Sequence, residues 1–279
     1  MRTKVLSLAL CSLLTSVAAA DEGWYANIDM LFIAPKISDQ GVTNIFYYGD
    51  LPSVTSQRGS IESPLEFAQR VNLGYEGDGG GGLRVRWFTF DNNLDYVGEV
   101  EEGGPPITLA GQINLDVDAI DSELTQRGNF ENWDWRVSGG ARYARVSLRE
   151  EAINFEDLSD IVWFGSTGVE FEGAGPTFSA EGNRPIIFDG LSVFARARTA
   201  LLFGQTDVWS AFEGGGRYRI HNEFVQVWEF QLGLESEREY ESFDLVSGIF
   251  WEAQRWDSDS GFLGDLAFHG FGARFGIEY

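Results

Sequence analysis

The chain ends in residues Phe271–Tyr279, FGARFGIEY, in which two kinds of residue alternate up to the last position. Aromatic and aliphatic residues hold the odd positions, whereas glycine, arginine and glutamate hold the even ones. Successive side chains of a β-strand point to opposite faces, so this order produces one apolar face and one face that carries charge. The stretch therefore predicts a two-faced strand of the kind that closes a transmembrane barrel.

The same alternation recurs along the whole chain. Residues 24–34 place Trp24, Ala26, Ile28, Met30 and Phe32 on one face for about eleven residues, the length that a tilted strand needs to cross a bilayer. Similar segments lie at 65–75, 83–87, 113–119, 133–143, 191–203, 224–234 and 245–254, and a weaker one at 168–181. We therefore predict an all-β fold, a closed antiparallel transmembrane barrel of about ten strands, with eight or twelve as alternatives.

The spacing of these segments predicts how the barrel is oriented. Long connections alternate with short ones, as in outer-membrane barrels, whose outer loops are long and whose periplasmic turns are short. The segments Lys36–Pro64 and Asp91–Ala110 are expected to be two of the long outer loops. An even number of strands leaves both termini in the periplasm. No linker or low-complexity tract divides the chain, so residues 21–279 are expected to form one domain.

The first twenty residues are typical of a secretory signal peptide. Arg2 and Lys4 precede an apolar stretch that is too short to span a bilayer, and Ala18–Ala20 supplies the small residues of a cleavage site. The single cysteine, Cys11, lies within this signal, so the mature chain is expected to hold no thiol and no disulfide.

Charge and composition exclude several classes of function. The formal net charge of −23 argues against a nucleic-acid partner, because phosphate binding needs a basic surface. With only two histidines, His221 and His269, and no cysteine after the signal, we expect no metal site and no cofactor. We also expect no enzymatic activity, although outer-membrane hydrolases share this architecture and a hydrolase stays open as a less favoured alternative.

An open sheet edge is too costly in hydrocarbon, because each unpaired backbone group loses several kcal/mol, so the strands must close on themselves. A soluble β-sandwich also alternates, but it puts its charges outside. We therefore expect the outer membrane of a Gram-negative-type bacterium. The partners that follow are membrane lipid and lipopolysaccharide, periplasmic chaperones and the barrel assembly machinery, with association into homo-oligomers left open. The machinery is expected to recognise Phe271, Phe275, Ile277 and Tyr279.

Four blocks of sequence resemble a known family. They are Val71–Asp91, Leu115–Arg127, Trp135–Arg145 and Phe171–Thr177. In their order and spacing they are similar to pore-forming outer-membrane proteins of the Legionella major outer membrane protein type, over about Gly23 to Tyr279. The resemblance implies a porin-like barrel and supplies neither catalytic residues nor a solute.

The charges of the polar face are expected to point into the lumen, where a channel selects its solutes. We predict a ladder of charges there that pair between strands. It consists of Arg84, Arg86, Asp116, Asp118, Arg136, Arg142, Arg196 and Arg198. The favoured function is a porin-like channel for the passive diffusion of ions or small solutes. Alternatively, the ion pairs fasten the inner wall of a narrow, plugged barrel that serves as a structural or adhesive protein, since barrels of eight strands are already filled by side chains.

Aromatic residues near strand ends on the apolar face predict an interfacial girdle, where an amphipathic ring sits at the level of the lipid headgroups. Its candidate members are Trp24, Trp87, Trp133, Trp135, Tyr143 and Trp228.

Overall fold

The computed structural model describes residues 23–38, 61–62, 64–100, 107–157, 160–186, 190–210, 216–260 and 265–279. The predicted signal peptide and most of the predicted loop Lys36–Pro64 lie outside these residues. No helix among the described segments is both long and apolar enough to cross a membrane.

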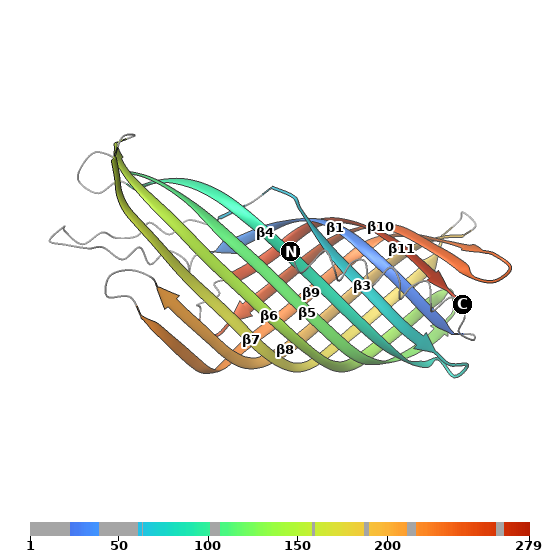
Figure 1. Cartoon of the computed structure of the whole chain (residues 1–279). Coiled ribbons are helices and arrows are strands. Elements are labelled where there is room, and N and C mark those ends of the chain that lie inside the picture. Colours follow the sequence, from blue (N-terminus) through green and yellow to red (C-terminus); the bar gives the residue numbers. More distant parts are fainter. Residues whose placement is uncertain are drawn as a thin grey trace.

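Ten antiparallel strands form a closed barrel, as the alternation predicts (Figure 1). Each strand pairs with its neighbours in chain order, and the last pairs with the first, so that the sheet closes on itself. A two-residue strand, β2 (Ile61–Glu62), pairs with the far end of β1. The barrel strands are β1 (Trp24–Ser38), β3 (Glu66–Glu76), β4 (Gly81–Val100), β5 (Ile107–Phe130), β6 (Trp133–Asp157), β7 (Asp160–Pro185), β8 (Leu191–Ser210), β9 (Arg217–Glu239), β10 (Asp244–Ser258) and β11 (Asp265–Glu278).

The two ends of the barrel differ. At one end, which we call the turn end, residues 77–80, 131–132, 186–190 and 240–243 connect successive strands and β11 ends. The C-terminus marks this end in Figure 1. The other end, which we call the loop end, holds the remaining connections.

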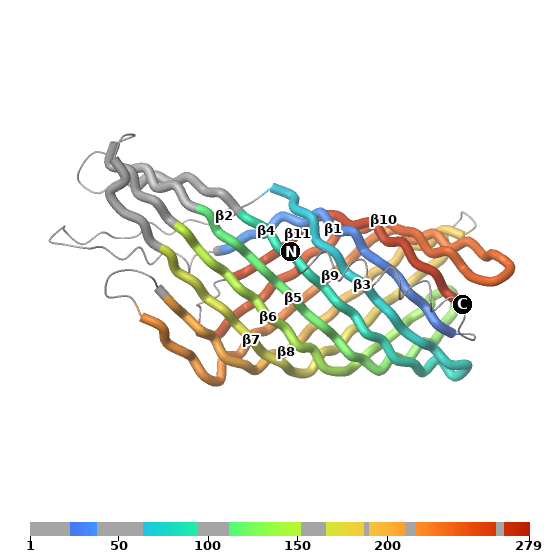
Figure 2. The backbone as a smooth tube through the Cα atoms, viewed as in Figure 1, coloured from blue at the N-terminus to red at the C-terminus, as the bar shows by residue number. Residues whose placement is uncertain are grey.

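The strands differ in how far they extend toward the loop end. Strands β5, β6 and β7 have 24, 25 and 26 residues, whereas β1, β3 and β11 on the other side of the barrel have 15, 11 and 14. Crossing the hydrocarbon takes about 9–11 residues of a tilted strand. Figure 2 shows the strands running obliquely to the long axis, and in Figure 1 the strands β4–β7 reach farthest from the C-terminus. Strands β4–β9, with 20 to 26 residues each, therefore form a tall wall that is longer than a membrane requires.

One prediction from the sequence is wrong in this part of the barrel. The expected loop Asp91–Ala110 is mostly strand, because β4 continues to Val100 and β5 begins at Ile107. The apolar alternation ends near Asp91 because the outer face becomes polar there. The strand itself goes on, since its backbone stays paired in register from Asp91↔Asp116 to Val100↔Ile107.

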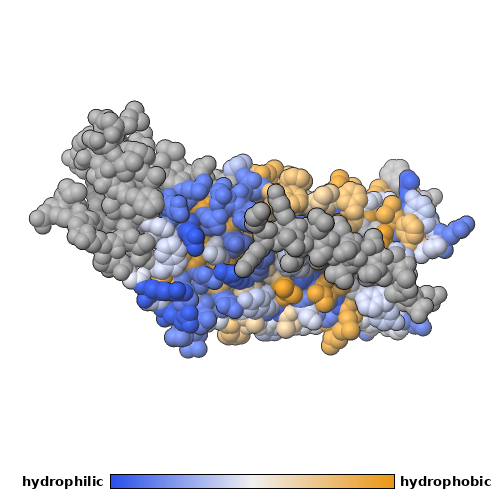
Figure 3. All heavy atoms as spheres, viewed as in Figure 1, coloured by the Kyte–Doolittle hydropathy of each residue, from blue (hydrophilic) through white to orange (hydrophobic). Residues whose placement is uncertain are grey.

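The outer surface has two zones. On β4 the outward residues near the turn end are Leu83, Val85 and Trp87, and the exposed ones farther along are Asp91 and Asn93. Figure 3 shows the hydrophobic residues gathered mainly over the half of the barrel nearer the turn end and hydrophilic residues over the other half. An outward apolar belt of limited height is the part of a barrel that lipid surrounds. The polar zone beyond it is suited to water.

The inner surface has the same two zones in reverse. On β4 the inward residues are Arg84 and Arg86 near the turn end, followed by Phe88 and Phe90, all of them buried. On this strand the inside is charged where the outside is apolar, and the inside is apolar where the outside is polar. The barrel is thus a membrane barrel over its first half and is built like a water-soluble barrel over its second half.

Candidate functional site in the barrel lumen

Charged side chains from all ten barrel strands meet inside the membrane-facing half. We call this group the charged layer. It consists of Asp29, Arg70, Arg84, Arg86, Asp121, Glu123, Arg142, Glu181, Arg198, Glu229, Glu252 and Arg274. These residues point inward because they alternate with the lipid-facing residues of their strands. None is more than 10% exposed, so the layer is almost fully withdrawn from solvent.

The middle of the layer is a network centred on Asp121. Its carboxylate accepts hydrogen bonds from Arg142 Nε at 2.6 Å and from Arg86 Nη1 at 2.9 Å. Glu229 on β9 binds both arginines, with Arg142 Nη1 at 2.7 Å from its Oε1 atom. The four side chains come from β4, β5, β6 and β9, so they tie opposite walls of the barrel together. Buried charges need this degree of pairing because an unpaired one would cost several kcal/mol.

A second network lies where the barrel closes. Arg70 on β3 binds Glu252 on β10 through two hydrogen bonds of 2.5 and 2.8 Å. The amides of Gln231 and Gln254 donate to the same carboxylate at 2.6 and 2.5 Å. Glu252 is thereby surrounded by donors and fully buried.

A third group continues the charges toward the turn end. Glu181 on β7 binds Arg84, and it also lies 3.4 Å from Arg196 and 3.6 Å from Arg136. Arg196 in turn donates to Glu235 on β9 at 3.2 Å. Arg136, Arg196 and Glu235 are partly exposed, which indicates that solvent reaches the lumen from the turn end.

On the loop-end side of the charged layer lies a second layer of side chains, which we call the apolar layer. Phe268 on β11 packs edge-on against Phe90 on β4, with ring centroids 5.1 Å apart, and so joins two strands that are not neighbours in the sheet. Each member of the layer is at most 3% exposed, which leaves no room for a water column along them. The members are Leu31, Ile33, Phe88, Phe90, Leu115, Val117, Val146, Phe171, Leu202, Val227, Trp256 and Phe268.

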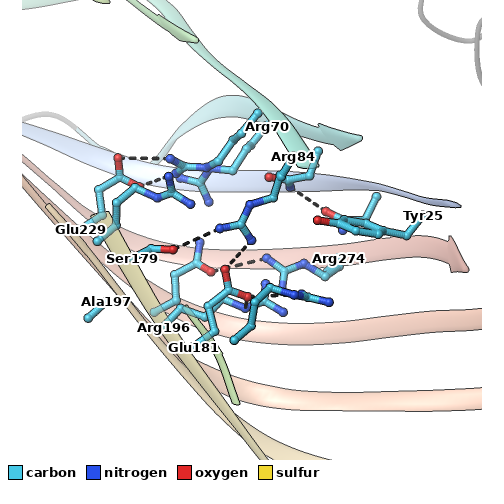
Figure 4. Close-up of a pocket in the computed structure, with 15 residues that line it drawn as sticks. Tyr25, Arg70, Arg84, Ser179, Glu181, Arg196, Ala197, Glu229 and Arg274 are labelled. Atoms are coloured by element: carbon cyan, nitrogen blue, oxygen red, sulfur yellow. Dashed lines mark hydrogen bonds and ion pairs between the residues drawn. The ribbon is translucent and has the colours of Figure 1, made fainter. Parts of the chain in front are cut away.

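Cavities remain in the charged half. One of about 50 Å³ lies within the charged layer, and Figure 4 shows the side chains that line it. Another, of about 80 Å³, lies nearer the turn end, beside Arg127, Asp134 and Glu237. Neither is lined by a residue of the apolar layer. Both are large enough for a few water molecules only.

The structure places the six predicted arginines, Arg84, Arg86, Arg136, Arg142, Arg196 and Arg198, inside the barrel. The expectation for Asp116 and Asp118 is wrong. Both lie on the outer wall, because Leu115, Val117 and Ala119, which alternate with them, are buried in the apolar layer or beside it. The carboxylates that β5 does turn inward are Asp121 and Glu123.

A signal for Asp121 and Glu123 is present in the sequence. On β5 the apolar residues occupy odd positions as far as Ala119 and even positions from Ile120 to Leu124. The odd positions of β5 therefore point inward throughout, first with the apolar residues up to Ala119 and then with the carboxylates Asp121 and Glu123. Single residues of the layer, such as Asp29, Arg70, Glu229 and Glu252, carry no such signal, because one buried charge in an alternating strand resembles any other polar residue.

The predicted girdle residues all point outward. Trp24, Trp133 and Trp135 lie at the turn end of their strands. Trp87 and Tyr143 lie where the outer face becomes polar, and the Tyr143 hydroxyl donates to Glu172 at 2.8 Å. Trp228, half exposed, lies midway along β9. The aromatic rings therefore occur at two levels, as a membrane with two interfaces would require.

The candidate assembly residues Phe271, Phe275 and Ile277 lie on the outer face of β11. Tyr279 extends this strand, since its backbone N–H donates to the Trp24 carbonyl at 2.9 Å. Their recognition by the assembly machinery stays a prediction.

The two histidines are both exposed and line neither lumen cavity. Among the described residues, no group of three or more histidine, cysteine or acidic side chains is arranged to hold a metal ion. The expectations that the chain has no metal and no catalytic activity stay predictions.

Comparisons with known proteins address the family and the fold. No curated protein sequence matches the chain. Among solved structures, the outer membrane protease OmpT of Escherichia coli is similar at a TM-score of 0.54 with 9% identity, covering 94% of this chain and 99% of that one. At this identity the likeness concerns the fold alone. A major outer membrane protein of Thermus thermophilus (10% identity, TM-score 0.38) covers 90% of this chain and 98% of its own.

The family model described as the Legionella pneumophila major outer membrane protein precursor matches residues 16–257. These residues include nine of the ten barrel strands almost completely, so the match confirms the family that the four sequence blocks resemble. The closed barrel, its apolar belt and this match agree, and the chain belongs to the outer-membrane β-barrel family of the Legionella pneumophila major outer membrane protein.

Proposed function

We propose that this protein is a surface-projecting outer-membrane barrel whose lumen is closed, and that it works as a structural or adhesive barrel. The single observation that carries the proposal is the stacking of two filled layers across the lumen. An ion entering from the turn end meets paired charges and then side chains that are at most 3% exposed. An open porin lines its channel with solvated polar residues, and porins use sixteen or more strands to make room for it.

The part of the molecule that would act at the surface is the tall wall. Strands β4–β9 have 20 to 26 residues each, and their outer face beyond the apolar belt is polar. The charges there include Asp91, Asp116, Arg145, Glu170 and Asp207. The apolar layer packs against the inner side of this wall and stabilises it, so its polar outer face can bind partners outside the cell.

A passive channel is the second candidate, and one observation favours it. The two cavities lie side by side in the charged half and share six lining residues, so the apolar layer is the main barrier left between the turn end and the loop end. Movement of that layer would be needed for conduction.

Electrical recording from planar bilayers separates the two candidates. We expect wild-type protein, shown to be folded by heat-modifiable gel mobility, to give no conductance above the lipid background. The variant Phe90→Ala/Phe268→Ala removes two rings of the apolar layer and is expected to leak. The matched control is Phe32→Ala/Phe67→Ala, a lipid-facing pair with ring centroids 5.9 Å apart, which should stay silent. Steady conductance of the wild type would favour the channel and reject the closed barrel.

Surface projection is tested by labelling intact cells. The predicted mature chain has no cysteine, so single cysteines can be introduced at will. Asp118→Cys, on the polar wall, should react with a membrane-impermeant maleimide, whereas Leu124→Cys, on the apolar belt of the same strand, should not. Protection of Asp118→Cys in intact cells together with labelling after lysis would contradict the proposed orientation.

A further inference from the structure

The cavity of about 50 Å³ inside the charged layer has an unusual lining. Seven arginine side chains face it, from Arg70 on β3 to Arg274 on β11, against only two carboxylates, Glu181 and Glu229. The remaining polar atoms belong to neutral side chains such as Tyr25, Asn72 and Gln231. Guanidinium groups carry hydrogen-bond donors and no acceptor, so the wall of the cavity is dominated by donors.

The charged layer holds six carboxylates, but only Glu181 and Glu229 face the cavity. Asp29, Asp121, Glu123 and Glu252 pair with these arginines and are absent from its lining. Arginine is the longer side chain, so it reaches toward the barrel axis, while the shorter carboxylates stay closer to the wall. The network is paired as a whole, and the space in its middle is surrounded by positive charge.

Three residues that line this cavity carry a buried donor without a partner. The Tyr25 hydroxyl, the Arg70 Nε atom and the Arg136 Nε atom make no hydrogen bond, although the side chains are only 5%, 1% and 17% exposed. In Figure 4 the Tyr25 side chain enters from β1 with its hydroxyl toward the middle of the group. Buried donors are almost always satisfied, so three unpaired donors on residues that line one cavity point to an acceptor there.

The site can be reached from the turn end. The second cavity, of about 80 Å³, shares Tyr25, Asn27, Arg136, Glu181, Arg196 and Arg274 with the first. Its outer part also carries acidic residues, among them Asp134, Glu237 and Glu278. These carboxylates slow the entry of anions without closing the route, because Arg127 and Arg136 lie among them.

We propose that the inner cavity binds one small inorganic anion of halide size. The anion accepts hydrogen bonds from the Tyr25 hydroxyl and from the surrounding guanidinium groups, which bind anions strongly in a space that excludes bulk water. A volume of about 50 Å³ holds a halide with a few waters. The proposal concerns the interior of the barrel and holds whether or not the barrel conducts.

The position of the anion is tested with bromide. Crystals of the folded protein in detergent, soaked in sodium bromide, are expected to show an anomalous peak in the cavity, within hydrogen-bond distance of the Tyr25 hydroxyl. An ordered cavity that holds only water, or bromide peaks found only on the outer surface, would overturn the proposal.

The affinity is tested by thermal unfolding at constant ionic strength, with bromide replacing isethionate, an anion too large for the cavity. The wild type should be stabilised with a saturable bromide dependence. Tyr25→Phe keeps the ring and removes the hydroxyl, and it is expected to raise the bromide concentration at half-saturation roughly tenfold, the effect of losing one hydrogen bond to a charged ligand. The matched control Tyr75→Phe lies on the lipid-facing side and should leave that concentration unchanged. An equal dependence in wild type and Tyr25→Phe would refute the assigned site.

Discussion

Arg274 on the last strand and Asp29 on the first form a two-pronged ion pair, with Nε–Oδ1 and Nη2–Oδ2 distances of 2.6 and 2.8 Å. The two residues are 245 positions apart, and both are buried. Asp29 also accepts a hydrogen bond from Arg70 at 3.3 Å, so one carboxylate serves strands on both sides of the closure. The pair therefore ties the end of the chain to its beginning.

Breaking this pair should destabilise the barrel strongly. In Asp29→Asn the buried charge of Arg274 loses its two-pronged partner and keeps only Glu235, at 3.3 Å, which costs about 3–5 kcal/mol. Urea unfolding followed by heat-modifiable gel mobility measures the loss. The control Asp257→Asn removes the partner of Arg255, a half-exposed pair, and should cost less than about 1 kcal/mol. Similar losses in the two variants would mean that the closure has no special role.

The apolar layer should behave as a packed core. Phe268→Ala leaves a hole beside Phe90 and is expected to lower the free energy of unfolding by about 3–5 kcal/mol. Phe271→Ala, three positions along the same strand on the lipid-facing side, removes an equal ring from an exposed position and should cost less. Equilibrium unfolding of both variants in the same detergent makes the comparison. A larger loss for Phe271→Ala would argue against a filled lumen.

The outer wall should show a pH dependence at Asp116. Partial burial and the neighbouring carboxylates Asp91 and Asp118 raise the pKa of Asp116 above its ordinary value of 3.8. A carboxyl whose pKa is higher in the folded chain binds its proton more tightly there, so its contribution to stability falls as the pH rises above 3.8. Asp116→Asn should therefore be more stable than the wild type at neutral pH. The advantage should vanish near about pH 3, where both forms are uncharged. Unfolding midpoints across this range test it, and a variant that is less stable at neutral pH contradicts it.

Asp207 on the same wall should respond in the opposite sense. Hydrogen bonds from Arg219 and Arg217 lower the pKa of Asp207 to about 2. Because the pKa of Asp207 is lower in the folded chain than its ordinary value of 3.8, the ionised carboxylate stabilises the fold at pH values above 3.8. This stabilisation is lost as the pH falls toward about 2. Asp207→Asn should thus be less stable than the wild type at neutral pH and equal to it below about pH 2. The side chains are exposed, so the effect should weaken at high salt, and an effect independent of salt would contradict this explanation.

Tyr279 allows assembly to be separated from stability. Its backbone amide donates to the Trp24 carbonyl, and its ring centroid lies 6.2 Å from that of Phe243 at the turn end. Tyr279→Ala keeps the backbone bond and removes only the ring. We expect a lower fraction of heat-modifiable barrel in cell envelopes, with unfolding in detergent little changed. The control Tyr240→Ala, which removes the other ring stacked on Phe243, should assemble normally. Equal assembly of both variants would show that the terminal ring is no signal.

The sequence by itself determined the strands near the turn end, their closure into a barrel and the inward direction of residues such as Arg84 and Arg142. Alternation has a period of two, and lipid on one side forces every second residue to be apolar, so these features are written locally along the chain. The rule was misleading for Asp116 and Asp118. Alternation states that two faces differ, but which face is the inside depends on whether lipid or water lies outside.

The tertiary structure decided where along each strand the lipid-facing surface gives way to the water-facing surface. It also decided how the lumen is filled. The pairing of Arg274 with Asp29, of Arg70 with Glu252 and of Arg86 with Glu229 joins residues at least 143 positions apart. No local pattern specifies such partners, because they follow from the register of ten strands and from the side-chain lengths that meet at the barrel axis. Whether the lumen is closed or open therefore depends on the packing and charge pairing of side chains that come from all ten strands.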